Sequence, residues 1–242
     1  MLVLALDTAT PTVIAGVVRL LQPHEMITAL QAQDGDANHP DPIQLLAQHT
    51  VDDPFAHAER LMPLANAALA EAGSTLSALD AVVVGLGPGP FTGLRVGIAT
   101  AEALGDALDR PVLGVPSHDG VALSFDEPPG PFLVVTDARR KEVYVTAYNG
   151  AGHPISRPQV LAPSALAGWI ASLGAAPVAI SGAGAELAGL ELPLLKPGPA
   201  SLGLVRAARP ALVTGAVPGP LTPLYLRRPD ATEPTARKSV LT

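Results

Sequence analysis

Two short segments of the chain combine residue types that could bind phosphate. The first is Asp7-Thr8-Ala9-Thr10, which follows an apolar run. An Asp at the end of a strand can hold a metal-bound water, and the hydroxyl and amide groups of the next turn can donate to a phosphate. The same residues also fit a structural role, in which the carboxylate accepts the turn amides and fixes a hairpin. Both interpretations stay open at this point.

The second segment is the glycine-rich stretch 85–97, Gly-Leu-Gly-Pro-Gly-Pro-Phe-Thr-Gly-Leu-Arg-Val-Gly. It lies between an expected strand and an expected helix, where exposed amides form a natural anion site. It is not a Walker A loop, because no Gly-Lys-Ser/Thr follows, and its glycine spacing does not match the dinucleotide pattern. The alternative is a tight turn in which Thr92 caps the helix, while Gly93 and Gly97 allow close helix packing.

Other chemistry-bearing residues give weaker signals. Arg139-Arg140-Lys141 stands two residues after Asp137 and could meet a phosphate or an acidic partner, or could form a solvated hairpin tip. The six histidines are scattered without an i+4 partner, and the chain has no Cys. We therefore assign no metal ligand and no catalytic residue.

The elements that position these residues alternate between strands and helices, which is typical of an α/β fold. We expect helices over 57–73, 92–109, 117–125, 163–173 and 201–214. We expect strands over 1–7, 12–20, 25–32, 43–52, 80–86, 112–115, 131–137, 142–149 and 177–181.

An internal repeat organises these elements. Residues 2–18 align without gaps on residues 132–148, and each copy has an apolar strand, a terminal Asp (Asp7 or Asp137), a five-residue turn and a second strand. The two copies predict a duplicated domain with a cleft between its halves. Charge also divides there: residues 1–130 hold 16 acids and 4 bases, a net charge of 4 − 16 = −12, whereas 131–242 hold 6 acids and 11 bases, a net charge of 11 − 6 = +5.

Composition excludes several classes of protein. Apolar residues are 48% of the 242 residues, which suits a folded domain, and a net charge of -7 argues against a free-standing nucleic-acid binder. Charged residues are only 15%, so we expect a partner to cover part of the surface. The uncharged stretch 158–185 is interrupted by Gly174 and Pro177, so we expect no membrane span. We see no targeting segment and expect a cytoplasmic protein.

Four motifs together resemble the bacterial TsaB (YeaZ) family. They are Leu4-Ala-Leu-Asp-Thr-Ala-Thr10, His57-Ala-Glu-Arg-Leu-Met-Pro-Leu64, Gly87-Pro-Gly-Pro-Phe-Thr-Gly-Leu-Arg-Val-Gly97 and Asp137-Ala-Arg-Arg-Lys-Glu-Val-Tyr144. The resemblance implies a duplicated RNase-H-like, two-lobed fold of the actin, sugar-kinase and heat-shock-chaperone ATPase type. We divide the chain accordingly into an acidic, partner-docking N-terminal lobe (1–111), a basic C-terminal lobe (112–220), and a tail (221–242) that either packs back or is disordered.

The resemblance also implies a function. The family supplies a non-catalytic scaffold subunit for the tRNA N6-threonylcarbamoyladenosine modification, which dimerises with a TsaD-type catalytic paralogue and recruits a TsaE-type ATPase. The paralogue binds a metal through two His at i and i+4, where this chain has Ser117 and Val121. We expect a homodimer in isolation, contact with tRNA only through the complex, no membrane, no tightly bound cofactor, and ATP or ADP at the complex interface. The alternative is a free-standing ATP-dependent small-molecule kinase or acyltransferase of the same fold, which would use Asp7 and Asp137.

Two sets of candidate site residues follow. The nucleotide or phosphate candidates are Asp7, Thr8, Thr10, Gly87, Gly89, Asp137 and Arg139. The family docks through helices, so the partner-binding candidates lie on helices 57–73 and 92–109: Leu61, Leu64, Ala68, Gly93, Gly97, Ala101 and Leu104.

Overall fold

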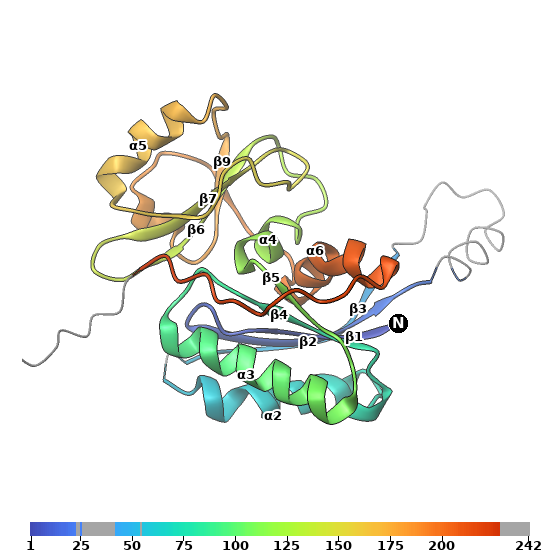
Figure 1. Cartoon of the computed structure of the whole chain (residues 1–242). Helices are drawn as coiled ribbons and strands as arrows, with labels where there is room; N and C mark the ends of the chain where they lie inside the picture. Colours follow the sequence, from blue (N-terminus) through green and yellow to red (C-terminus); the bar gives the residue numbers. More distant parts are fainter. Residues whose placement is uncertain (23–24, 26–41, 54, 228–242) are drawn as a thin grey trace, which may run out of the picture.

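A computed structural model describes residues 1–22, 25, 42–53 and 55–227. The expected strand 25–32 lies outside the described residues except for Glu25. Within the described part, two five-stranded sheets form two lobes (Figure 1).

The first sheet has the strand order β3-β2-β1-β4-β5. Strands β1 and β2 form an antiparallel hairpin that pairs Asp7 with Ile14, and β4 and β5 run parallel to β1. Helices α2 and α3 lie together on one face, and α6 covers the other (Figure 1). The bounds are β1 (Leu2–Asp7), β2 (Thr12–Leu20), β3 (Ile43–Asp52), α2 (His57–Glu71), β4 (Ala81–Gly85), α3 (Phe91–Leu108), β5 (Val112–Val115) and α6 (Ala200–Thr214), with a short 3-10 helix at Leu76–Ala78.

The second sheet repeats this topology in the order β8-β7-β6-β9-β10. Its hairpin pairs Asp137 with Val143, and β9 runs parallel to β6 as β4 does to β1. The predicted duplication is therefore confirmed at the level of strand order and register. The bounds are α4 (Ser117–Ala122), β6 (Phe132–Asp137), β7 (Val143–Tyr148), β8 (Gln159–Leu161), α5 (Pro163–Ser172), β9 (Ala179–Ser181) and β10 (Leu194–Leu195), with a 3-10 helix at Ala185–Ala188.

Strand β1 shows why the sequence folds in this way. Its residues alternate between the two faces: Leu4 and Leu6 join the core under α2 and α3, and Val3 and Ala5 join the core under α6. A strand covered on both faces needs an uninterrupted apolar run, and residues 2–6 supply one.

The expected lobe boundary at 111/112 is wrong. Strand β5 lies at the edge of the first sheet, because a parallel strand after α3 completes a strand–helix–strand crossover. Helix α6 also packs on the first sheet, through Leu204, Val205, Ala208 and Leu212. Two elements of the 112–220 range thus belong to the first lobe.

Other differences are local. Helix α3 begins at Phe91 after Pro90, so the expected cap Thr92 is a helical residue and not the N-cap. Helix α4 is shorter than expected and ends at Ala122. The two edge strands of the second sheet, β8 and β10, have three and two residues, too few for a periodic pattern to reveal them.

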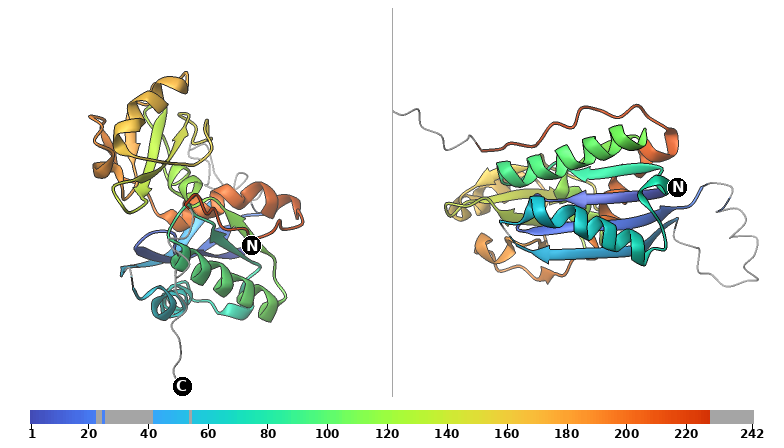
Figure 2. Two further views of the ribbon diagram at one scale, coloured as in Figure 1. Left: turned by 60° about the vertical axis from the view of Figure 1, so that its left-hand side comes forward. Right: turned by 90° about the horizontal axis from the view of Figure 1, so that it is seen from below.

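The tail begins by packing back on the molecule. After α6 the chain forms a C-terminal strap, residues 216–227, which runs beside α3 toward the second lobe (Figure 2). Leu221 packs against the core of the first lobe, and the amide of Leu224 donates to the carbonyl of Leu86 at 2.8 Å. Residues 228–242 lie outside the described part. No helix in the described residues is long and apolar enough to cross a membrane.

Candidate functional site

The carboxyl group of Asp7 is buried at the end of β1. Its Oδ1 accepts the amide of Ala9 at 2.7 Å, and the hydroxyl of Ser117 is also a hydrogen-bond partner. Ser117 Oγ in turn accepts the amide of Gly87 at 3.1 Å. Burial raises the pKa of the Asp7 carboxyl, and the hydrogen bonds to Ala9, Ser117 and Thr8 act in the opposite direction. The Asp7 carboxyl group is therefore buried, and its hydrogen-bond partners all belong to this chain.

The glycine-rich loop covers the turn that follows Asp7. Thr8 is buried, and its hydroxyl donates to the carbonyl of Gly93 at 2.7 Å. Any side chain at Gly93 or Gly97 would overlap Thr8, and one at Gly89 would overlap the carbonyl of Ala9. The close-packing alternative for Gly93 and Gly97 is thus the one that the structure adopts.

The equivalent turn of the second lobe repeats the same hydrogen bond. Asp137 Oδ1 accepts the amide of Arg139 at 2.7 Å, as Asp7 accepts that of Ala9. The backbone then enters the left-handed region at three successive residues, Arg139, Arg140 and Lys141, with φ of 65°, 53° and 62°. This conformation costs a non-glycine residue roughly 1–2 kcal/mol. The turn is therefore strained, and other contacts must hold it.

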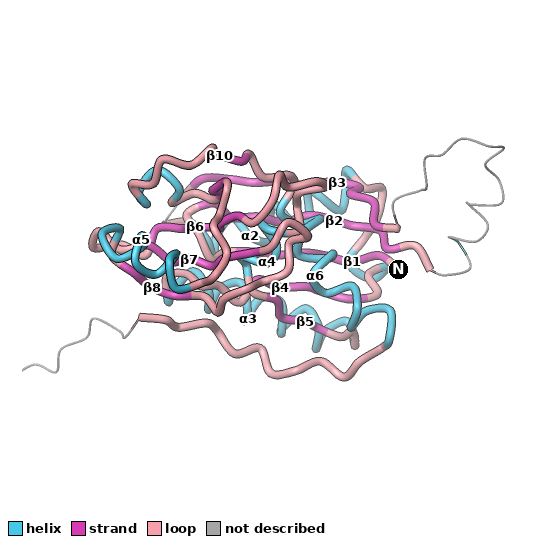
Figure 3. The backbone as a smooth tube through the Cα atoms, turned by 90° about the horizontal axis from the view of Figure 1, so that it is seen from above, coloured by secondary structure: helices cyan, strands magenta, loops and turns pink. Residues whose placement is uncertain are grey.

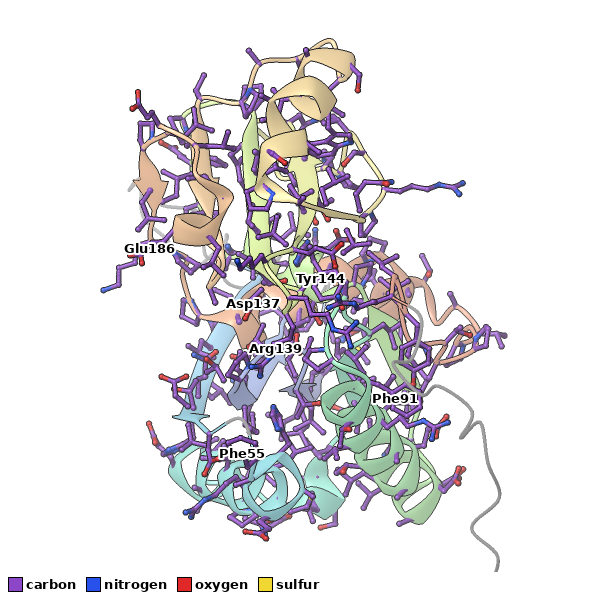
Figure 4. The ribbon with its side chains drawn as sticks, turned by 90° about the vertical axis from the view of Figure 1, so that its left-hand side faces the viewer. Phe55, Phe91, Asp137, Arg139, Tyr144 and Glu186 are labelled. Carbon is purple, nitrogen blue, oxygen red and sulfur yellow. The ribbon has the colours of Figure 1, made fainter. Side chains whose placement is uncertain are left out.

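Two cavities at the meeting of the lobes bring some of the predicted residues together. One, of about 350 Å³, is lined by Thr10, Phe55, His57, Thr92 and Arg139, among others. The other, of about 260 Å³, is lined by Thr10, Asp137, Glu186 and Leu187, among others. Figure 4 shows Asp137 and Arg139 between the lobes, with Phe55 and Phe91 below them.

The predicted phosphate candidates thus separate into two groups. Thr10, Asp137 and Arg139 line these cavities. Asp7, Thr8, Gly87 and Gly89 are buried beneath them and do not line either cavity. The imidazole of His57 lies beside Thr10 in the first of these cavities, with its Nε2 2.8 Å from the carbonyl oxygen of Thr10.

Comparison with known proteins identifies the fold. The family model described as TsaD, tRNA N6-adenosine threonylcarbamoyltransferase, matches residues 55–185, more than half of the chain. The solved structure of YeaZ from Pseudomonas aeruginosa is 26% identical, with a TM-score of 0.61 over 93% of this chain and 100% of that one. The Escherichia coli protein described as tRNA threonylcarbamoyladenosine biosynthesis protein TsaB is 34% identical over 116 residues, 46% of this chain and 50% of the relative.

The chain belongs to the TsaB (YeaZ) family. An uncharacterized protein of Mycobacterium tuberculosis is 44% identical over 230 residues, which is 95% of this chain and 93% of that one. The two repeated sheets and the YeaZ structures together confirm the duplicated RNase-H-like fold.

In this TsaB-family chain, most of the predicted partner-binding residues face the chain's own sheet. Leu61, Ala68 and Ala101 are buried in the core of the first lobe, and Gly93 and Gly97 pack on Thr8. Leu64 and Leu104 are partly buried against the same core. Buried side chains cannot contact a partner in this conformation, whereas Leu64 and Leu104 keep part of their area exposed.

Sequence reasoning missed a buried polar cluster on α4 of this family member. The imidazole of His118 lies between two hydroxyls, with Nδ1 2.8 Å from Thr146 Oγ1 and Nε2 2.9 Å from Thr136 Oγ1. Burial lowers the pKa of His118 to about 3, so the ring is neutral. Next to it, the hydroxyl of Tyr148 donates to Asp119 at 2.6 Å. The alternation of β6 and β7 could have revealed Thr136 and Thr146 as inward polar residues in need of a partner.

These side chains attach α4 to the second sheet of the TsaB-type fold. The neighbouring Ser117 and Val121 stand where the paralogue is expected to carry its metal ligands, and Ser117 is engaged with Asp7 and Gly87. Among the described residues, no group of three or more His, Asp or Glu side chains is placed to hold a metal ion.

Proposed function

We propose that the chain is a non-catalytic scaffold subunit in tRNA N6-threonylcarbamoyladenosine biosynthesis, which pairs with a TsaD-type paralogue and helps to recruit a TsaE-type ATPase. The similarity to TsaB proteins supports a role in this pathway. The observation that carries the scaffold assignment is the enclosure of Asp7 and its turn by the glycine-rich loop.

The chemistry of that enclosure argues against catalysis in the first lobe. A carboxylate that holds a metal-bound water needs an open coordination position, whereas the contacts of Asp7 are with its own turn and Ser117. The Ala9 amide donates to Asp7, and the Thr8 hydroxyl donates to Gly93, so neither group is available to a phosphate.

The outer faces of α2 and α3 are the proposed docking surface for the paralogue. They lie side by side on the side of the first sheet opposite α6 (Figures 1 and 2). Small side chains there allow a second pair of helices to approach closely. The exposed alanines of this surface are Ala58, Ala67, Ala70, Ala99, Ala103 and Ala107. The same surface would serve a homodimer when the paralogue is absent.

The inter-lobe cavities are the proposed place for ATP or ADP in the assembled complex. Thr10, Asp137 and Arg139 line them, and the partner would supply the remaining residues of the nucleotide site. Contact with tRNA would then be made through the complex, and the isolated chain would hold no nucleotide tightly.

A single-turnover assay tests the scaffold assignment. The chain alone, given tRNA and threonylcarbamoyl-adenylate, should transfer no threonylcarbamoyl group, and addition of the TsaD-type and TsaE-type proteins should support modification. Transfer by the chain alone would refute the assignment. If the chain were instead a free-standing ATP-dependent enzyme, Mg-ATP at saturation would raise its melting temperature.

Co-purification with the TsaD-type protein tests the docking surface. Ala67→Arg on α2 and Ala103→Arg on α3 place long cations on the proposed surface without touching the core. Each should raise the Kd of the complex at least ~10-fold, since substitutions at the centre of an interface cost more than about 1.4 kcal/mol of binding free energy. The matched control is Ala165→Arg, exposed on α5 of the second lobe, which should leave the complex intact. If all three variants bind the TsaD-type protein as tightly as the native chain does, the interface lies elsewhere.

A further inference from the structure

The C-terminal strap contacts both lobes at a distance from the α4–α6 contact. Elsewhere the lobes meet through α4, which packs on both α6 and the second sheet, and through Arg206 of α6, which donates to the carbonyl of Leu123 at 3.1 Å. The strap instead passes from the end of α6 along α3 and reaches the tip of the β6–β7 hairpin (Figures 1 and 3).

Three contacts hold the strap to the first lobe. Leu221 is partly buried against the apolar core, and the amide of Leu224 donates to the carbonyl of Leu86. The ring of Tyr225 stacks on Phe91 with their centroids 4.9 Å apart, and the guanidinium of Arg95 lies 4.3 Å from the centre of the Phe91 ring. Together these contacts fix the strap along the N-terminal half of α3.

Arg227 holds the strap to the second lobe. Arg227 donates through Nη1 to the carbonyl of Ala138 at 2.7 Å, and its Nη2 lies 3.0 Å from a carboxylate oxygen of Glu142. Ala138 and Glu142 bracket the three residues with left-handed backbone. A single guanidinium thus braces both ends of the strained turn, and such turns persist only when their surroundings over-determine them.

The composition of the strap suits a connecting role. Pro218, Pro220 and Pro223 restrict the backbone to extended conformations, so less entropy is lost when the strap is ordered than for a flexible linker. Between the end of α6 and its first anchor, Leu221, the strap is only loosely packed, and Val217 is 90% exposed. Cavities lie between the strap and α3, one of them lined by Ile98, Ala99, Leu221 and Tyr225.

We propose that residues 216–227 form an inter-lobe clasp. The clasp holds the turn 138–142 of the second lobe against the first lobe and sets the opening of the cavity that Arg139 lines. When the contacts of Arg227 with Ala138 and Glu142 break, the strained turn relaxes and the two lobes move relative to each other about the α4–α6 contact.

Spin-label distance measurements test the clasp directly, because the chain has no native Cys. Labels at Ala107→Cys on α3 and Ala165→Cys on α5 report the separation of the lobes from exposed positions. The distance distribution should be narrow in the full chain and in a chain that ends at Arg227. It should broaden in a chain that ends at Gly215 and in the full chain with Arg227→Ala.

Hydrogen exchange supplies a second readout that does not depend on truncation. The Ala138 amide donates to Glu142 and the Glu142 amide donates to Arg139 across the turn. Both should exchange about 10-fold faster in Arg227→Ala, because local opening becomes easier. Val217→Ala, an exposed strap position, is the matched control and should change neither readout. An unchanged distance distribution in the chain that ends at Gly215, or unchanged exchange in Arg227→Ala, would overturn the proposal.

Discussion

Asp7 and His118 are both buried ionisable groups, and burial changes their proton affinities in opposite senses. For the carboxyl of Asp7, burial disfavours the charged form and raises the pKa. For the imidazole of His118, burial disfavours the cation and lowers the pKa to about 3. Each group therefore makes the free energy of unfolding depend on pH, and replacing that one residue removes its share of the dependence.

Asp7→Asn should keep the fold and remove a pH-dependent penalty. Because the folded pKa of Asp7 is raised, its contribution is favourable below the unfolded pKa of about 3.9 and is lost as pH rises through the folded value. The amide avoids this loss and can still accept the Ala9 N–H. Urea unfolding should find Asp7→Asn at least as stable as the native chain at pH 7, with its advantage shrinking as pH falls.

Asp7→Ala is the matched control for this substitution. It leaves the buried Ala9 amide without its acceptor, and should be roughly 1–3 kcal/mol less stable than Asp7→Asn at every pH. Asp7→Asn should also support modification in the assembled complex. Loss of that activity with stability intact would show that the Asp7 carboxylate takes part in the chemistry.

His118→Gln should flatten the acid side of the stability curve. The lowered pKa means that the histidine contributes stability above its unfolded pKa of about 6.5, and that this is lost as pH falls toward the folded value. The native chain should lose about 2 kcal/mol relative to the variant between pH 7 and pH 5, at about 1.4 kcal/mol per unit below 6.5. Gln can still donate to one threonine and accept from the other. Parallel curves for the two proteins would show that the ring is protonated in the fold.

At the scale of elements, the sequence predicted the two hairpins well. Each is a local unit whose alternating apolar residues and terminal Asp are all contained in about 17 residues, so the repeat with Asp137 could be aligned directly. The cleft followed from the duplication, and it does bring Thr10 near Asp137 and Arg139. The edge strands β8 and β10 were missed because their pairing is set by tertiary neighbours.

The same reasoning selected docking candidates that mostly face the chain's own sheet. Helical periodicity identifies the apolar stripe of a helix, and on α2 and α3 that stripe is the one that faces the chain's own sheet. Leu61, Ala68 and Ala101 were selected by the pattern that buries them. The surface available to a partner lies on the opposite side, where exposed alanines give no periodic signal.

Gly97→Ala tests the close contact between α3 and the first turn. The added methyl would overlap the hydroxyl of Thr8, which is buried and bonded to Gly93. Overpacking of this kind costs about 1–3 kcal/mol and should exceed the gain in helix propensity of about 1 kcal/mol. Thermal or urea unfolding of Gly97→Ala, Thr8→Ala and the double variant forms a cycle. The double variant should recover part of the loss, and strictly additive effects would contradict the contact.

At the scale of the whole molecule, the two lobes are not independent units along the chain. Helix α6 comes from the C-terminal half but covers the first sheet, including Val3, Ala5 and Leu113. The first 111 residues alone would leave this apolar face open. The change in net charge between residues 1–130 and 131–242 therefore does not coincide with the boundary between the two lobes, because α6 belongs to the second range but packs on the first sheet.

The lobes meet where α4 and α6 approach backbone to backbone. At Gly203 of α6 a side chain would overlap the carbonyl of Gly120 on α4, and at Gly120 it would press on Leu204. Helix α4 is attached to the second sheet through His118 and Tyr148, so this contact fixes one lobe against the other.

Gly203→Ala should therefore disturb the arrangement of the lobes as well as the stability. Since the contact is with backbone, which cannot rotate away, α4 and α6 must separate, and the loss should be about 2 kcal/mol or more. The spin-label pair at positions 107 and 165 should report a shifted distance in this variant. Gly168→Ala in α5, where nothing lies within 4 Å of the added carbon, is the matched control. It should be neutral or stabilise by up to about 1 kcal/mol, because alanine favours a helix over glycine. A Gly203→Ala variant with native stability and an unshifted distance would mean that the helices do not meet this closely in solution.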